Sequence, residues 1–119
     1  MRESTVERVL QKSIKQQGGW CLKFVSPGTD GVPDRICILP GGVVAFVETK
    51  APGKRIKVGG LQEFWGRELK RLGFEWFEVS TTEDARRTAQ YLGQISRRRT
   101  GQAPSKPGKE VSREMQSDE

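Results

Sequence analysis

Residues 31–50 have the sequence GVPDRICILPGGVVAFVETK, in which two apolar, β-branched runs flank a short turn at residues 40–42. Two such runs joined by a proline and glycine turn predict an antiparallel β-hairpin. If the turn has three residues, Leu39 pairs with Val43, and the same register places Asp34 opposite Glu48. A turn that is one residue shorter would pair Asp34 with Val47 instead, so the predicted register depends on the length of the turn.

Two carboxylates and one ammonium group would meet at the open end of this hairpin. Side chains alternate between the two faces of a strand, so Lys50 shares a face with Glu48. Opposed like charges destabilise a sheet, and a divalent cation such as Mg²⁺ would remove the repulsion between Asp34 and Glu48, because it binds carboxylate oxygens. A second explanation stays open: Lys50 neutralises Glu48 as an exposed pair, and Asp34 is a turn residue.

The chain is basic, because 21 Lys and Arg residues against 15 Asp and Glu give its 119 residues a net charge of +6. This length suits one domain with a modest core. The excess of positive charge favours a polyanionic partner, with nucleic acid as the first candidate. The chain has no histidine, which excludes Ser-His triads, His-ligated zinc and imidazole acid–base catalysis. Catalysis must therefore use carboxylates, lysine or metal-bound water.

The two cysteines, Cys21 and Cys37, each lie in an apolar run and have no CxxC spacing. We interpret them as buried, reduced thiols, which are typical of cytosolic proteins. The sequence shows no signal peptide and no apolar run of about 18 residues. We therefore expect a cytoplasmic protein.

Before the hairpin, the sequence predicts a helix and a short strand. Ser4 and Glu7 have the spacing of a capping box at the start of the helix, and this role alone would explain Glu7. Residues 20–25 predict the strand, and residues 26–33 a turn-rich loop whose glycines would allow close approach to a ligand. The predicted core positions of the helix are Val6, Val9, Leu10 and Ile14.

Cations are concentrated directly after the hairpin. Lys50 is followed by Lys54, Arg55 and Lys57, and no acidic residue occurs between Glu48 and Glu63. A basic loop beside a metal site could hold a phosphate backbone. A simple solvated loop is the alternative.

The remaining segments predict a helix, a strand and a last helix. Residues 61–72 form the helix with Gln62 in its first turn, and residues 74–79 form the strand, so that a parallel crossover is expected. The last helix follows residues 80–82, which supply its N-cap. From Arg97 onward the chain is polar, and we expect a folded domain at residues 1–96 and a disordered tail at residues 97–119. The core positions expected in the helix of residues 61–72 are Leu61, Phe64, Trp65, Leu69 and Leu72.

This order of elements and motifs resembles the PD-(D/E)xK nuclease superfamily and, within it, the virus-type replication-repair nuclease (VRR-NUC) domain. The resemblance rests on Glu7 in the first helix, the run GVPDR at residues 31–35, Glu48-x-Lys50, and Gln62 at the start of the second helix. It spans roughly residues 4 to 92. It implies an α/β fold of the restriction-endonuclease type, αβββαβ(α), with a mixed central sheet flanked by helices.

The resemblance also implies roles for individual residues. Asp34, Glu48 and the Thr49 carbonyl would hold a catalytic Mg²⁺ or Mn²⁺, with Glu7 as an auxiliary ligand. Lys50 would orient or activate the attacking water, and Gln62 would support the site from its helix. We add Arg35 to the DNA-binding candidates, which are otherwise the loop residues Lys54, Arg55 and Lys57.

Three hypotheses of function follow. The first is a metal-dependent endonuclease on branched DNA such as Holliday junctions, since short members of this family are phage-like and resemble homodimeric junction resolvases. Such a protein would serve DNA repair and, if phage-encoded, would lie in the host-cell cytoplasm. The others are a sequence- or end-directed nuclease of restriction or packaging, and a non-catalytic DNA-binding module. We expect a homodimer whose interface includes the helix with Trp65 or the strand with Trp76.

Overall fold

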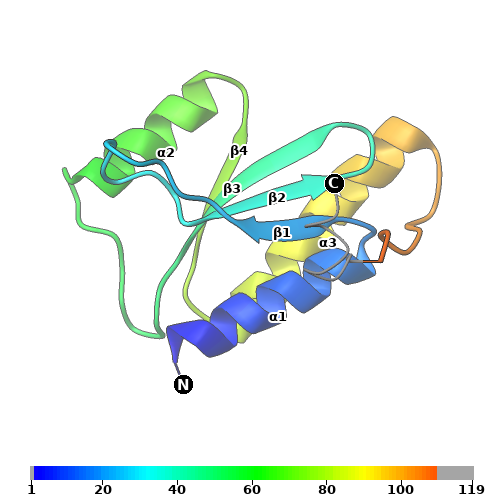
Figure 1. The fold of residues 1–119 in the computed structure, drawn as a ribbon, viewed down its shortest axis with the longest axis horizontal. Coiled ribbons are helices and arrows are strands. Elements are labelled where there is room, and N and C mark those ends of the chain that lie inside the picture. Colours follow the sequence, from blue (N-terminus) through cyan, green and yellow to red (C-terminus); the bar gives the residue numbers. More distant parts are fainter. Residues whose placement is uncertain (1, 110–119) are drawn as a thin grey trace, which may run out of the picture.

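The computed structural model describes residues 2–109 and shows a four-stranded sheet with helices on both faces (Figure 1). The strands lie in the order β1-β2-β3-β4; β1, β2 and β3 are antiparallel neighbours, and β4 runs parallel to β3. The predicted α/β fold with a mixed sheet is confirmed. The elements in chain order are α1 (Glu3–Gln16), β1 (Trp20–Lys23), β2 (Arg35–Leu39), β3 (Val43–Thr49), α2 (Leu61–Arg71), β4 (Glu75–Val79) and α3 (Thr82–Thr100).

The hairpin of β2 and β3 has the predicted register. Leu39 pairs with Val43 and Arg35 with Val47, so the turn has three residues. Gly41 and Gly42 have φ angles of 85° and 71°, a region that favours glycine. The register therefore brings Asp34 beside the end of β3, as expected.

α1 and α3 cover one face of the sheet and enclose the hydrophobic core (Figure 1). The apolar residues of the two helices recur at helical spacing, so each helix turns one apolar side toward the sheet. β3 is apolar without interruption from Val43 to Val47 and is buried on both faces. Val9, a predicted core position, is only partly buried at the margin of this core. The fully buried side chains at its centre are Val6, Leu10, Ile14, Val47 and Leu92.

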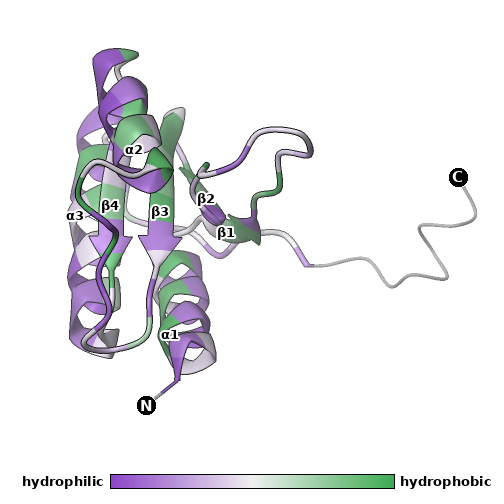
Figure 2. Ribbon diagram, turned by 90° about the vertical axis from the view of Figure 1, so that its left-hand side faces the viewer, coloured by the Kyte–Doolittle hydropathy of each residue, from purple (hydrophilic) through white to green (hydrophobic). Residues whose placement is uncertain are grey.

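α2 lies on the other face of the sheet (Figure 1) and carries both hydrophobic and hydrophilic residues (Figure 2). It buries much less of its surface than α1 and α3 do. Its contact with β4 is built on Gly66, where a Cβ atom would lie 2.5 Å from the Trp76 ring. The core positions predicted for Leu61, Phe64 and Leu72 are wrong, because these side chains are 57%, 52% and 57% exposed. Helical spacing shows which residues share a side of a helix, but not whether another element covers that side.

The predicted capping box is also wrong. α1 begins at Glu3 with Arg2 at the N-cap position, and no side chain of the described residues caps it. The Glu7 carboxylate instead bonds to side chains of the sheet. By contrast, the cap predicted for the last helix is present, because the Thr81 hydroxyl accepts a hydrogen bond from Asp84 N at 3.0 Å.

The last helix is longer than predicted. α3 continues through Thr100 and ends where Gly101 adopts a positive φ of 68°, so residues 97–100 belong to the folded part and not to a tail. Beyond it, residues 104 and 105 lie against Gly18. The rest of the predicted tail, residues 110–119, lies outside the described residues. Within residues 2–109, no helix is both long and apolar enough to cross a membrane.

Candidate metal centre and nucleic-acid interface

Asp34 lies directly before the first residue of β2. Its carboxylate accepts hydrogen bonds from Thr49 of β3, in place of the backbone bonds that a longer β2 would have made. Its Oδ1 accepts from Thr49 N at 2.9 Å, and its Oδ2 accepts from the Thr49 hydroxyl. β2 begins only at Arg35, which pairs with Val47, so the Thr49 N–H on that side of β3 has no backbone partner in β2. The strand end thus fixes the Asp34 carboxylate beside Thr49.

Two carboxylates from α1 join Asp34. Glu7 Oε1 lies 3.1 Å and Glu3 Oε1 3.5 Å from the Thr49 hydroxyl, and oxygens of Glu3, Glu7 and Asp34 lie within 4.8 Å of one another. Glu7 was predicted from the sequence, whereas Glu3 was not. The signal was present, because residues four apart on a helix share one side.

Arg35 faces this carboxylate group. Its guanidinium lies 3.2 Å from Glu7 Oε2, and its side chain is only 12% exposed. A nearly buried, ion-paired guanidinium is poorly placed to contact a phosphate backbone. We therefore assign Arg35 to the support of Glu7 and withdraw it from the predicted DNA contacts.

Glu48 lies on the opposite face of β3 from Thr49, toward α2. Gln62 in the first turn of α2 donates a hydrogen bond from Nε2 to Glu48 Oε1 at 2.9 Å, so the predicted meeting of these two residues is present. Glu48 Oε2 is buried and has no hydrogen-bond partner within residues 2–109. An unpartnered buried carboxylate oxygen costs free energy, and a bound cation would remove that cost. The residues present therefore fit a hard divalent metal.

The pKa values of both hairpin carboxylates are raised. Burial, followed by the negative charge of Asp34, raises the pKa of Glu48 to about 7, although Lys50 opposes the shift. Burial also raises the pKa of Asp34, against the hydrogen bonds from Thr49. These carboxylates repel each other's charge, which is the situation that a cation relieves.

The α2 end of the site is held by the loop before β2. Trp65 donates from Nε1 to the Asp30 carbonyl at 3.1 Å. At Gly31, with φ of 86°, a Cβ atom would lie 2.4 Å from Leu61 Cβ. The close approach expected from the loop glycines is therefore made to α2, and it fixes the helix turn that carries Gln62.

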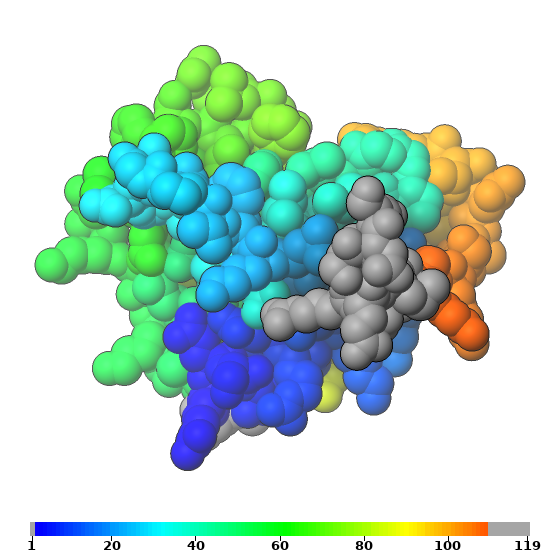
Figure 3. Space-filling model, in the orientation of Figure 1, coloured from blue at the N-terminus to red at the C-terminus, as the bar shows by residue number. Residues whose placement is uncertain are grey.

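The basic loop after β3 lies at the same end of the molecule. Lys54, Arg55 and Lys57 are exposed, and Figure 3 shows this segment (green) on the same side as the start of α1 (dark blue). A hydrogen bond from Ile56 N to Glu78 Oε2, at 2.7 Å, ties the loop to β4. Glu78 is the strand neighbour of Glu48, and the sequence analysis missed it.

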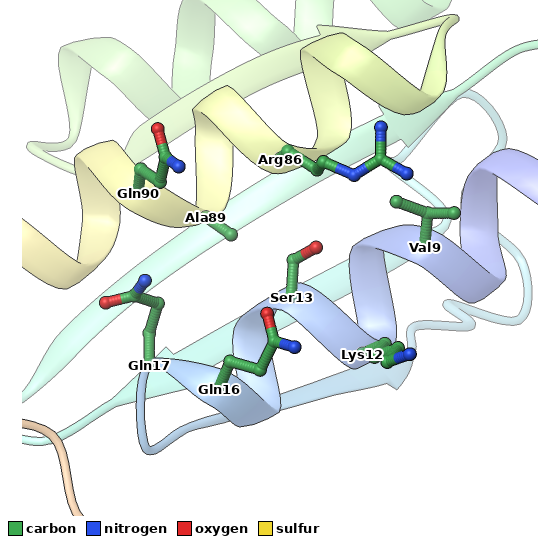
Figure 4. Close-up of a pocket in the computed structure, with 8 residues that line it drawn as sticks. All are labelled: Val9, Lys12, Ser13, Gln16, Gln17, Arg86, Ala89 and Gln90. Carbon is green, nitrogen blue, oxygen red and sulfur yellow. The ribbon is translucent and has the colours of Figure 1, made fainter.

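A hollow of about 430 Å³ opens between the basic loop and α2. Its lining combines the cations Arg67 and Lys70 with the acidic residues Glu63 and Glu78 and with apolar side chains such as Trp76. Another cavity, of about 270 Å³, lies between α1 and α3 and is lined mainly by polar side chains such as Lys12 and Arg86 (Figure 4). This second cavity shares no residue with the carboxylate site.

No protein-family model matches the chain, but the chain is similar to a phage protein described as a nuclease and to a solved nuclease-type domain. The chain is 49% identical to "Putative nuclease p44" of Acyrthosiphon pisum secondary endosymbiont phage 1 over 55 residues. These residues are 46% of this chain and 59% of that protein. The fold of this chain is similar to a solved structure described as a VRR_NUC domain. The TM-score is 0.64 at 26% identity, over 75% of this chain and 95% of the other.

Proposed function

We propose that this chain is a metal-dependent endonuclease that hydrolyses phosphodiester bonds in DNA. Its VRR-NUC fold supports this proposal. We further propose branched DNA, such as Holliday junctions, as its preferred substrate. Repair of DNA in the cytoplasm is the setting that we propose for it. The observation that carries the proposal is the buried, unpartnered oxygen of Glu48 beside Asp34, next to a basic loop.

The metal would be held by Asp34, Glu48 and the Thr49 carbonyl, with Glu7 as an auxiliary ligand. These are oxygen donors, which suit Mg²⁺ or Mn²⁺. When bound, such an ion supplies Lewis-acid chemistry: it makes water a better nucleophile and polarises a phosphoryl oxygen.

The chain's own residues position these donors. Gln62 holds one oxygen of Glu48 and leaves the other free, and the Thr49 N–H and hydroxyl hold Asp34. Lys50 lies close enough to Glu48 for its charge to oppose the rise in the pKa of Glu48. We assign to its ammonium group the task of orienting the attacking water and offsetting the negative charge that develops on the phosphate.

The DNA backbone would lie along the basic loop. Lys54, Arg55 and Lys57 are exposed, and each can approach a phosphate. Glu78 holds the loop at Ile56, so that the cations keep their position relative to Glu48. We propose these residues as contacts that position the DNA without selecting a sequence.

A junction must be cut on two strands, and one chain provides one such site, so we also propose a homodimer. The apolar surface that supports it lies on the predicted helix, but its exposed residues are not the tryptophans. Trp76 packs on Gly66 and Trp65 bonds to the loop, whereas Leu61, Phe64, Leu72 and Phe74 are 57%, 52%, 57% and 40% exposed.

One assay tests the proposed function. Labelled four-way junctions, flaps, splayed arms and plain duplex are incubated with the protein in Mg²⁺, in Mn²⁺ and in chelator. We expect junction cleavage that needs the metal and that is lost in Glu48→Gln. The matched control is Glu83→Gln, which alters an exposed glutamate paired with Arg87 on α3 and should cleave normally.

Three outcomes would contradict the proposal. Binding without cleavage in either metal would favour a non-catalytic DNA-binding module. Equal cleavage of plain duplex and junctions would favour a sequence- or end-directed nuclease. Cleavage that persists in chelator would remove the metal from the mechanism.

A further inference from the structure

Cys21 and Cys37 are directly paired across β1 and β2. Phe24 N donates to the carbonyl of its partner Asp34, which makes that pair a hydrogen-bonded one. Hydrogen-bonded and non-hydrogen-bonded pairs alternate along an antiparallel ladder. Three positions further along, Cys21 and Cys37 therefore form a non-hydrogen-bonded pair, whose Cα atoms are typically about 4.5 Å apart.

That spacing permits a disulfide. Disulfides span Cα distances of roughly 4.4 to 6.8 Å, so the pair lies at the short end of the allowed range. Both cysteines are free in this structure, and their thiols lie close enough for each to shift the pKa of the other. The two sulfur atoms can therefore join without a rearrangement of the strands.

One of the two thiols can be reached from outside. Cys21 lines a surface cavity of about 230 Å³ between α1 and β1, together with Lys15, Lys23 and Arg35. Cys37 does not line it and is fully buried. A small molecule in this cavity therefore contacts Cys21 and not Cys37, in positively charged surroundings that favour a thiolate.

The electrostatics of the pair follow the same asymmetry. The hydrogen bond from Cys37, aided by Arg35, lowers the pKa of Cys21 against the effect of burial. The pKa of Cys37 is raised, first by its hydrogen bond to Cys21 and then by burial. Cys21 is thus the better nucleophile of the two.

We propose that Cys21 is a site of oxidation by hydrogen peroxide and that Cys37 then closes a reversible cross-strand disulfide with it. The Cys21 thiolate attacks one peroxide oxygen, the O–O bond breaks, and a sulfenic acid forms while hydroxide leaves and takes up a proton as water. The Cys37 sulfur then attacks the Cys21 sulfur. The S–O bond breaks, and the hydroxide leaves with the Cys37 proton as a second water.

The disulfide is expected to be reversible because of the pair's geometry. Bridges at the edge of the allowed range are strained and more easily reduced. Glutathione in a cytosolic ratio should therefore restore the thiols. The Cys21–Cys37 disulfide is therefore a reversible modification and not a permanent structural cross-link.

The folded protein is treated with dilute hydrogen peroxide, blocked with a maleimide and digested with trypsin without reduction. Cleavage after Lys15, Lys23 and Arg35 releases one peptide with Cys21 and another, residues 36–50, with Cys37. We expect these two peptides to become linked within one chain, and to separate after glutathione. A link between two chains, or no link while the protein stays folded, would overturn the proposal.

Single variants test the order of events. In Cys37→Ser, Cys21 should stop at a sulfenic acid that dimedone traps; in Cys21→Ser, Cys37 should resist oxidation. Equal labelling of the two variants would contradict the assignment of Cys21. Lys23→Glu, inside the cavity, should slow oxidation severalfold relative to Lys12→Glu, which lies outside it on α1, and equal rates would exclude this cavity as the route. No readout depends on nuclease activity, so the proposed function is tested separately.

Discussion

Glu48 carries the largest electrostatic cost of any residue at the site. Its pKa rises from 4.5 to about 7 in the folded chain, so folding favours its protonated form. A raised carboxylate pKa adds stability below pH 4.5, and this stability is lost as the pH rises to about 7.

We therefore predict that the metal-free protein becomes less stable between pH 5 and pH 8, by an amount on the order of 2 kcal/mol. Glu48→Gln cannot ionise and should remove most of this change. Saturating Mg²⁺ should do the same for the wild type, because it stabilises the charged form. Thermal unfolding at the two pH values, in chelator and in Mg²⁺, measures the effect; equal slopes for variant and wild type would show that another group titrates.

Gln62 acts on Glu48 and not on the substrate, so it is a positioning residue. Gln62→Ala should lower cleavage by roughly 10- to 100-fold, as is typical when the partner of a metal ligand is removed. It should also weaken Mn²⁺ binding in calorimetry, whereas Lys50→Ala should lose cleavage and keep Mn²⁺ binding. If Gln62→Ala bound Mn²⁺ as tightly as the wild type, its hydrogen bond to Glu48 would have no part in metal binding.

From the sequence, Glu7 could either cap the first helix or assist metal binding, and a substitution distinguishes these two roles. Because it does not cap α1 but bonds to Thr49 and Arg35, we expect Glu7→Gln to lower cleavage severely with little change in thermal stability. Ser4→Ala is the control for the capping box and should be silent in both measurements. An active Glu7→Gln protein would remove Glu7 from the metal site.

At the scale of elements, β4 and the basic loop act together through Glu78. Glu78→Ala removes the acceptor of the Ile56 N–H, so the loop should become mobile and DNA binding should weaken severalfold. Glu78→Gln keeps an acceptor oxygen and loses only the charge, so it should bind DNA at least as well as the wild type. Equal binding by both variants, measured by fluorescence anisotropy, would show that the hydrogen bond does not position the loop.

The order and type of the elements could be predicted, because each has a clear pattern: two apolar, β-branched runs around a short turn in the hairpin, and helical spacing in α1 and α3. The hairpin register followed from one turn. Contacts between distant segments could not be predicted. The bond from Gln62 to Glu48 was expected only from the resemblance, and Glu3 and Glu78 were missed because their partners, Thr49 and Ile56, are far away in the sequence.

At the scale of the whole molecule, the apolar surface of α2 and the start of β4 is the candidate dimer interface. We predict that light scattering gives about twice the 13.4 kDa chain mass. Phe64→Glu should give a monomer that stays folded, because Phe64 is already half exposed. Val25→Glu, which alters an exposed apolar residue in a loop, is the control and should stay dimeric. A monomeric wild type, with and without junction DNA, would refute the dimer.

The hydrogen bonds between α3 and the hairpin turn have a consequence for folding during synthesis. Ser96 donates to the Pro40 carbonyl at 2.6 Å, and Arg99 to the carbonyls of Gly41 and Gly42. The core needs α1 and α3 on the same face of the sheet, and a ribosome delivers α3 last of the seven elements. Until α3 is synthesised, the part of this apolar face that α1 does not cover stays exposed, and exposed apolar surface favours aggregation or chaperone binding. Nascent chains stalled before residue 82 should remain sensitive to protease, and release of residues 82–100 should protect them.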